Sequence, residues 1–159
     1  MKVKKRHFLK KKEIKKIKDK LDEYSEIISE DSNVEIAYTT EFPLILVNKE
    51  PFAILYNEKI IPTLKAIIKT NIKPKKKVIV DMGAIKYISN GADVMCPGIV
   101  KADSKIKKGD ITVVIDEKHG KPLAIGFALI DGDEMTKRER GRAVKNIHYV
   151  GDKVWNLDL

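Results

Sequence analysis

Apolar residues near the start of the chain recur at helical spacing. Five of them follow one another at steps of three and four: Ile14, Ile17, Leu21, Tyr24 and Ile28. This spacing places side chains on one face of a helix. We therefore predict a helix from about Leu9 to Ile28. Because the pattern covers only about two heptads, packing on the chain's own sheet is favoured over a coiled coil.

Segments with strand character follow this predicted helix. They are separated by turn residues and lie at Val34–Thr39, Pro43–Asn48 and Phe52–Asn57. Pro62 can occupy the first position of a further helix. That helix is predicted to carry three apolar residues inward: Leu64, Ile67 and Ile68.

A proline within a run of lysines, at residues 73–77, predicts a domain boundary. We expect an N-terminal α/β domain at residues 1–75 and a second domain at residues 76–159. The overall fold class is then α+β.

After this boundary the chain changes to short apolar segments with frequent turns. The predicted strands are Val78–Asp81, Val94–Val100, Ile111–Asp116, Leu123–Ile130 and Val144–Val150. Residues 82–90 read as one or two helical turns ended by Gly91. Such a pattern predicts a small closed or nearly closed β-barrel. Residues 123–130 are apolar on both faces and therefore central, and Gly126 among them predicts a bend or a close backbone approach.

Positive charge is concentrated at the start of the chain. The whole sequence has 32 lysines and arginines against 23 acids, and residues 1–20 contain eleven of those bases and two of the acids. Such a segment attracts polyanions by releasing their counterions. The alternative is a solvated helix face, with lysine abundance as a compositional habit. The candidate electrostatic contacts are Lys4, Lys5, Arg6, Lys11, Lys12, Lys15 and Lys16.

Several classes of protein and site are disfavoured. One cysteine excludes an internal disulfide framework and a CxxC zinc site. No apolar run approaches the roughly 20 residues that span a bilayer, and the first residues lack the apolar core of a secretory signal, so a cytoplasmic location is expected. Cys96 reads as a buried small hydrophobe, although a pair with His148 stays open. Asp131, Gly132 and Asp133 read as a turn rather than a cation site. We predict no catalytic residue, no metal and no cofactor.

The C-terminal half resembles a PUA domain, the RNA-binding module named from pseudouridine synthases and archaeosine transglycosylases. The matching segments are residues 80–86 (VDMGAIK), 91–99 (GADVMCPGI), 108–110 (KGD), 124–126 (AIG) and 141–144 (GRAV). Any one of these pieces is weak, but their combination is specific.

The whole chain resembles more narrowly the malignant T-cell amplified sequence family, also called translation machinery-associated proteins. This resemblance rests on residues 93–98 (DVMCPG), the ending at residues 146–155 (NIHYVGDKVW) and a pre-PUA segment containing Pro62, Thr63 and Leu64. It implies a pre-PUA α+β domain followed by a PUA β-barrel. It also implies an RNA-binding protein that works with tRNA, the small ribosomal subunit or both in initiation or recycling. Eukaryotic relatives pair with a density-regulated-protein-like factor.

The PUA resemblance also implies RNA contacts along the short helix, the glycine loop after it, the next strand and a late strand. Small residues there let backbone amides approach phosphate or ribose, whereas the simpler interpretation is that the glycines only permit turns. The residues carried over are Met82, Gly83, Ala84, Ile85, Lys86, Gly91, Ala92, Asp93, Met95, Pro97, Gly98 and Arg142.

A second basic group consists of Lys137, Arg138, Arg140, Arg142 and Lys145. It adds Arg140 and Lys145 to the candidate RNA contacts. Guanidinium groups suit phosphates and base edges, but Glu134 and Glu139 could instead form surface ion pairs with this group. The aromatic candidates for stacking on a base are Tyr87, Tyr149, Phe127 and Trp155. Of these, Tyr87 is expected to be exposed, Phe127 to lie in the core and Trp155 to close the barrel.

The sequence thus predicts a non-catalytic protein that binds structured RNA, with no membrane or DNA partner. Two alternatives remain open. One is a protein–protein adaptor for an initiation-factor-like partner, and the other is an accessory subunit of an RNA-modifying enzyme.

Overall fold

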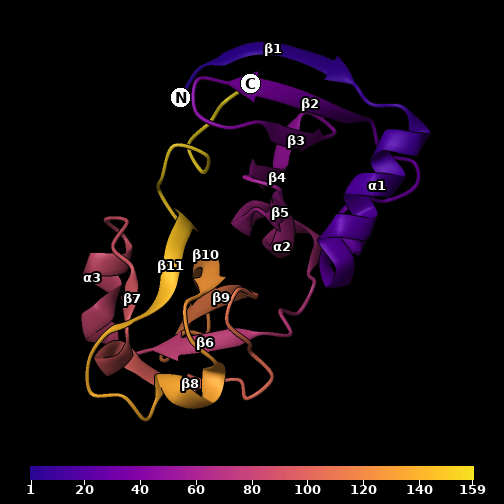
Figure 1. Cartoon of the computed structure of the whole chain (residues 1–159). Helices are drawn as coiled ribbons and strands as arrows, with labels where there is room; N and C mark the ends of the chain where they lie inside the picture. Colours follow the sequence, from indigo (N-terminus) through magenta and orange to yellow (C-terminus); the bar gives the residue numbers. More distant parts are fainter. The chain divides into compact units, whose positions relative to one another are not determined.

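The computed structural model describes all 159 residues and divides them into two compact units. The first unit comprises Met1–Lys73 together with Lys153–Leu159, and the second comprises Pro74–Asp152. In Figure 1 the yellow C-terminal segment returns to the indigo and purple strands of the first unit. The fold class α+β is confirmed. The boundary after residue 75 stays a prediction, and the structure places the last seven residues with the first unit.

The first unit is built on a five-stranded antiparallel sheet whose strands follow one another in chain order. Both faces of β3 are buried, so this strand lies in the core of the unit. The predicted strands at residues 34–39, 43–48 and 52–57 are present with small shifts at their ends. The strands are β1 (Val3–Phe8), β2 (Val34–Thr39), β3 (Leu44–Val47), β4 (Glu50–Tyr56) and β5 (Lys59–Pro62).

Strand β1 was not predicted, because three consecutive basic residues interrupt its apolar pattern. It lies at the edge of the sheet and pairs only with β2. An edge strand tolerates charged side chains, since one side of it faces water. Periodicity therefore gives little signal here.

Helix α1 (Lys11–Leu21) is shorter than the predicted helix. At Asp22 the backbone has a φ of 50°, and the chain continues as the 3₁₀-helix η1 (Asp22–Ile27). The predicted stripe nevertheless packs inward, since Ile17, Leu21, Tyr24 and Ile28 are all buried. The change of helix type brings Ile27 into the core as well, which a uniform 3.6-residue period does not show.

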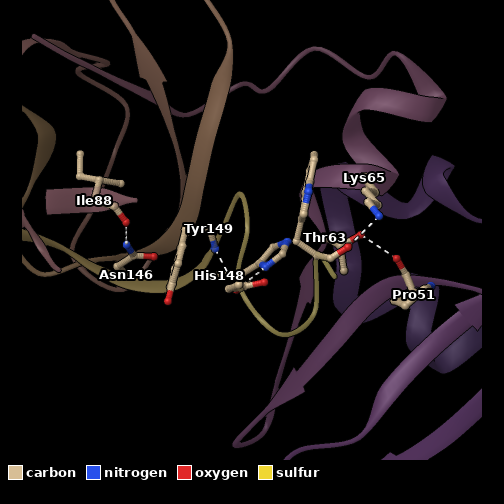
Figure 2. A network of polar contacts seen from close by, with 9 residues as sticks. Pro51, Thr63, Lys65, Ile88, Asn146, His148 and Tyr149 are labelled. Atoms are coloured by element: carbon tan, nitrogen blue, oxygen red, sulfur yellow. Dashed lines mark hydrogen bonds and ion pairs between the residues drawn. The ribbon is translucent and has the colours of Figure 1, made fainter. Parts of the chain in front are cut away.

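Helix α2 (Leu64–Thr70) begins two residues after Pro62, the predicted first helical residue. Its N-cap is Thr63, whose Oγ1 accepts from Ala66 N at 3.1 Å and donates to Pro51 O at 2.8 Å (Figure 2). Pro62 is instead the last residue of β5, so the predicted N1 role is wrong. The prediction that Ile68 points into the core is also wrong, because this residue is 50% exposed.

The predicted role of Trp155 in closing the barrel is wrong, because this residue belongs to the first unit. Lys65 Nζ donates to the backbone oxygen of Trp155 at 2.7 Å and lies 5.0 Å from the centre of its ring. The C-terminal segment is thus fastened to helix α2.

The second unit is a six-stranded sheet with the order β7-β11-β10-β9-β6-β8. Strands β6 and β9 are parallel, and all other neighbours are antiparallel. The order places β10 centrally, as predicted from its apolar sequence. The strands are β6 (Lys77–Val80), β7 (Val94–Met95), β8 (Ile99–Ala102), β9 (Ile111–Asp116), β10 (Pro122–Ala128) and β11 (Arg142–Tyr149).

Gly126 in β10 makes the close backbone approach that its position predicts. A Cβ atom there would lie 1.7 Å from the carbonyl oxygen of Lys145 on β11. The pairing of the two strands also shifts register between Ile125 and Gly126. Only glycine therefore fits this point of the barrel.

The single strand predicted at residues 94–100 is interrupted. The 3₁₀-helix η3 (Cys96–Gly98) separates β7 from β8, because Pro97 cannot donate a ladder hydrogen bond. The interruption lets the chain change partners, since β7 pairs with β11 and β8 pairs with β6. The predicted turn at residues 131–133 is also wrong: a short helix, α4 (Gly132–Met135), begins there and buries Met135.

Candidate nucleic-acid interface

A groove of about 660 Å³ opens on the second unit beside its short helices. One wall is formed by the 3₁₀-helix η2 (Met82–Ala84), helix α3 (Ile85–Ile88) and the turn that follows them. The other wall is formed by β7, η3 and the start of β11. We call this the apolar groove. Its lining residues are Asp81, Gly83, Ala84, Tyr87, Ile88, Ala92, Asp93, Val94, Met95, Pro97, Gly98 and Arg142.

Small residues set the width of the apolar groove. A Cβ atom on Gly98 would lie 3.1 Å from the Cβ of Ala84, so the two walls meet closely at this point. The amide of Asp81 also donates to the carbonyl of Gly98 at 2.9 Å. Larger side chains at residues 84 or 98 would force the walls apart.

Two local devices shape the helical wall. The Asp81 carboxylate accepts from Ala84 N at 2.9 Å and so starts η2. Gly91 ends the helical segment with a φ of 91°, and a Cβ there would lie 3.1 Å from the Tyr149 ring. The predicted helix end at Gly91 is therefore present, and two separate physical constraints favour glycine there.

Asn146 on β11 fastens the helical wall to the sheet. Its Nδ2 donates to the carbonyls of Ile88 at 3.2 Å (Figure 2) and of Ala92 at 3.0 Å. Its backbone amide donates to Asp93 Oδ1 at 2.9 Å. The other oxygen of Asp93 holds Arg142 Nη1 at 3.1 Å. Asn146 thus fixes the turn after α3, and Asp93 in that turn holds the groove's only lining arginine, Arg142.

Little charge lines the apolar groove. Its only charged residues are Asp81, Asp93 and Arg142. Asp81 is used as a helix cap, and Asp93 is paired with Arg142. The rest of the lining is apolar or very small, apart from the phenol of Tyr87. This lining is suited to the face of a base or to a ribose more than to a phosphate group.

The structure gathers many of the predicted site residues but not all of them. Eight line the apolar groove: Gly83, Ala84, Ala92, Asp93, Met95, Pro97, Gly98 and Arg142. Six do not line it: Met82, Ile85, Lys86, Gly91, Arg140 and Lys145. The role of all of them in RNA binding stays a prediction.

Four lining residues were absent from the predicted site: Asp81, Tyr87, Ile88 and Val94. Tyr87 is exposed, as expected, and Lys86 Nζ lies 5.1 Å from the centre of its ring. Asp81 could have been found from its position directly before the helical segment, where a capping side chain is favoured. Ile88 and Val94 gave no signal beyond that of ordinary core residues.

The second basic group is partly neutralised. Arg138 Nε lies 3.5 Å from Glu134 Oε2, and Arg142 is paired with Asp93. The pair of Arg138 with Glu134 matches the alternative of surface ion pairs, whereas Arg142 is paired with an acid that was not expected, Asp93. Arg140 is exposed and lies two residues before β11 begins.

The basic N-terminal segment lies in the first unit. Lys4, Lys5, Lys11, Lys12, Lys15 and Lys16 are all exposed, the first two on β1 and the others on α1. None of these lysines is paired with a carboxylate. Arg6 differs, because its guanidinium holds the buried Glu35 carboxylate through two hydrogen bonds of 2.9 Å. These hydrogen bonds keep the pKa of Glu35 below its ordinary value despite burial.

The residues considered for chemistry do not form a common site. Cys96 is buried, as predicted. His148 is also buried, and its Nδ1 lies 2.8 Å from Asp152, whereas His7 and His119 are exposed in separate segments. No group of three histidine, cysteine or acidic residues is arranged to hold a metal ion. The longest helix, α1, has eleven residues, and no helix reaches the length and hydrophobicity needed to cross a membrane.

Comparison with known proteins adds to this geometry. Residues 76–150 match the PUA domain, and residues 5–70 match a domain of unknown function (DUF1947). The chain is 52% identical to an uncharacterized protein of Methanocaldococcus jannaschii over 99% of both chains. It is 32% identical to Translation machinery-associated protein 20 of Saccharomyces cerevisiae, over 93% of this chain and 83% of the yeast protein.

A solved structure has the same fold. The crystal structure of a hypothetical protein from Pyrococcus horikoshii is 39% identical and covers 95% of this chain, which spans 98% of that one, with a TM-score of 0.83. A PUA domain suggests RNA binding, and the yeast relative implies a role connected with translation. The resemblance noted in the sequence is thereby confirmed: the chain belongs to the translation machinery-associated family of PUA-domain proteins.

Proposed function

We propose that the protein binds structured RNA, namely tRNA, small-subunit ribosomal RNA or both, in translation initiation or recycling, and that it does so without catalysis. The apolar groove is the observation that carries this proposal. It joins walls of small residues to one anchored arginine, Arg142, in a matched PUA domain. The family relationship supplies the connection with translation.

The groove suits an unpaired nucleotide at the end or in a loop of a folded RNA. Its apolar lining can contact a base face or a ribose, and small residues such as Gly83 and Ala84 leave the backbone accessible. Arg142 extends its exposed guanidinium at the rim, where a phosphate can approach. Recognition then rests on shape more than on a dense set of charges.

The lysines of the N-terminal segment would add attraction that does not depend on sequence. Exposed lysines contact RNA phosphates and release counterions, which strengthens binding at low salt. Arg6 does not contribute to this attraction, because its guanidinium is paired with the Glu35 carboxylate.

The direct test is a single charge placed in the groove. Met95 lines the groove and is 46% exposed, so the substitution Met95→Glu adds a carboxylate without opening a core cavity. We expect at least about tenfold weaker binding to tRNA or to isolated small subunits, since the carboxylate would face the RNA in an apolar setting. Filter binding or fluorescence anisotropy measures this change.

A matched control is available on the edge strand β8. Val100 is 52% exposed and lies outside the groove, so Val100→Glu adds the same charge to the same unit. It should leave affinity within about twofold, since rim charges far from a contact have small effects. Equal affinities of the two variants would overturn the groove as the RNA site.

Crosslinking in cells followed by RNA sequencing distinguishes the RNA partners. Footprints on tRNA or small-subunit RNA support the proposal, whereas a footprint confined to one guide RNA or one modified tRNA region favours an accessory subunit of a modifying enzyme. Purification after RNase treatment completes the test. If a density-regulated-protein-like factor stays bound and no RNA footprint is found, the protein is an adaptor.

A further inference from the structure

The first unit carries a pair of exposed rings on its edge strand and the neighbouring strand. His7 on β1 and Tyr38 on β2 have ring centres 6.1 Å apart and ring planes inclined by 34°. His7 is exposed, and Tyr38 remains 40% exposed. Neither ring lies in the apolar groove, so the proposed groove contacts do not use them.

The strand register places a lysine on the same face as the two rings. Lys5 is directly opposite Tyr38, and His7 is directly opposite Ile36. Opposite residues of an antiparallel pair project to the same side, and so do residues two apart on one strand. Lys5, His7 and Tyr38 therefore share one surface, which we call the outer β1–β2 face.

The one acidic residue of these two strands, Glu35, lies on the face opposite to the outer β1–β2 face. Arg6 is opposite Ala37, and Phe8 is opposite Glu35, so these four residues belong to the reverse face. Glu35 is the only acidic residue in the two strands, and it is buried and paired with Arg6. The outer β1–β2 face consequently combines aromatic rings and positive charge with no opposing carboxylate.

This combination points to one class of ligand. An apolar peptide would gain nothing from unpaired lysines, and an acidic peptide would not need two exposed rings. Unpaired RNA uses both, because its bases stack on aromatic side chains while lysines contact the phosphates. The rings are too close to enclose a base between them at 6.1 Å, so a base would stack on the outward side of one ring.

We propose that the outer β1–β2 face is a second RNA contact, in which Tyr38 and His7 stack an unpaired base and Lys5 contacts the adjoining phosphate. The inference rests on the proposed function in that the ligand is RNA. It assigns to the first unit an ordered contact with a nucleotide, in addition to the diffuse attraction of its lysines.

The test uses the full chain and a fluorescein-labelled decamer of uridines as the probe. Tyr38→Ala should weaken binding about tenfold, which corresponds to the loss of one stacked base. Tyr38→Phe and Tyr38→Trp should retain affinity because they keep a ring. Lys5→Gln should lower the slope of log affinity against log salt by about 0.7.

Phe8 provides the matched control. It is 66% exposed and lies on the reverse face of the same edge strand, so Phe8→Ala removes an exposed ring without touching the outer β1–β2 face. Its affinity should equal that of the wild type. If Phe8→Ala and Tyr38→Ala have the same effect, the proposal is overturned.

A crosslink that needs no substitution separates this site from the groove. A 4-thiouridine decamer irradiated with the wild-type protein should label the peptides containing His7 or Tyr38, and the label should persist in Met95→Glu. If neither peptide is labelled, the second contact is overturned. The groove proposal is then still supported if Met95→Glu binds tRNA more weakly than the wild type. If the label persists and Met95→Glu binds tRNA normally, only the groove proposal fails.

Discussion

The two candidate surfaces of this protein differ in shape and in charge. The apolar groove of the second unit has a defined shape but little free charge, since Arg142 is held by Asp93. The outer β1–β2 face and helix α1 of the first unit carry exposed lysines. The recess of about 790 Å³ beside α1 is lined mostly by charged and polar side chains. Shape selects a ligand at short range, whereas charge acts over about 10 Å at ordinary salt. Under the proposed function, the groove would supply most of the selection by shape, and the lysines of the first unit would supply most of the long-range attraction.

The arginine–carboxylate pairs of the two units also differ. In both units an arginine is bound to a carboxylate, Arg6 to Glu35 and Arg142 to Asp93. The first pair fixes a buried carboxylate between two strands, while the second leaves a largely exposed guanidinium at the groove. Under the proposed function, lysines, which have flexible stems and a compact charge, would supply the attraction instead.

The largest effect is expected from breaking the second unit. Gly126→Ala would place a Cβ 1.7 Å from a backbone oxygen of β11, where no side chain can yield. We expect the free energy of unfolding to fall by about 3 kcal/mol or more, measured by urea denaturation. Gly83→Ala is the control, because its Cβ meets only ordinary contact at 3.4 Å. Equal midpoints for the two variants would contradict the close approach.

A smaller effect is expected from removing the attraction while leaving the groove unchanged. Replacing four lysines of α1 by glutamine should lower the slope of log affinity against log salt by about 2–3, with the loss greatest at low salt. The four are Lys11, Lys12, Lys15 and Lys16.

The control removes an equal number of exposed lysines from the second unit: Lys101, Lys105, Lys107 and Lys108. Its slope should stay closer to that of the wild type. If both quadruple variants lose the same slope, attraction is a property of the total charge, and the division between the two units is wrong.

The smallest effect concerns the carboxylate inside the first unit. Glu35 has a pKa below its ordinary value of 4.5, chiefly because of the hydrogen bonds from Arg6. The pair therefore contributes stability that is complete above pH 4.5 and is lost as the pH falls through the lower folded pKa. Glu35→Gln should cost about 1 kcal/mol at pH 7.

The variant should also show a flatter loss of stability between neutral and acidic pH than the wild type, as followed by thermal unfolding. The exposed Glu58 provides the comparison, since Glu58→Gln should change neither stability nor its pH dependence. If the stability of the wild type does not fall more steeply with decreasing pH than that of Glu35→Gln, the proposed contribution of the Arg6–Glu35 pair is contradicted.

Periodicity predicted the elements that pack on the core, because burial imposes a regular spacing. Strands β9 and β10 and the inward stripe that includes Leu21 and Tyr24 follow from it directly. It failed where the backbone departs from a uniform period. The break at Asp22, with a φ of 50°, and the helical turn around Pro97 both depend on local backbone geometry that the spacing of apolar residues does not reveal.

The groove was accessible to sequence reasoning only through family resemblance. The residue types alone would have left Gly83 and Gly98 as turn residues, since each has no side chain whose pattern could be followed. The hydrogen bonds of Asn146 to Ile88 and Ala92 join positions more than fifty residues apart. Such contacts depend on tertiary structure and leave no periodic signal in the chain.

The return of residues Lys153–Leu159 to the first unit has a consequence for synthesis. Val154 is buried there, and Trp155 is fastened to Lys65 on α2. The N-terminal unit cannot complete its core until these late residues have left the ribosome, whereas Pro74–Asp152 are already translated by then. Completion of the earlier-made sheet therefore waits for the end of synthesis, in contrast to the usual order in which an N-terminal unit folds as soon as it has emerged.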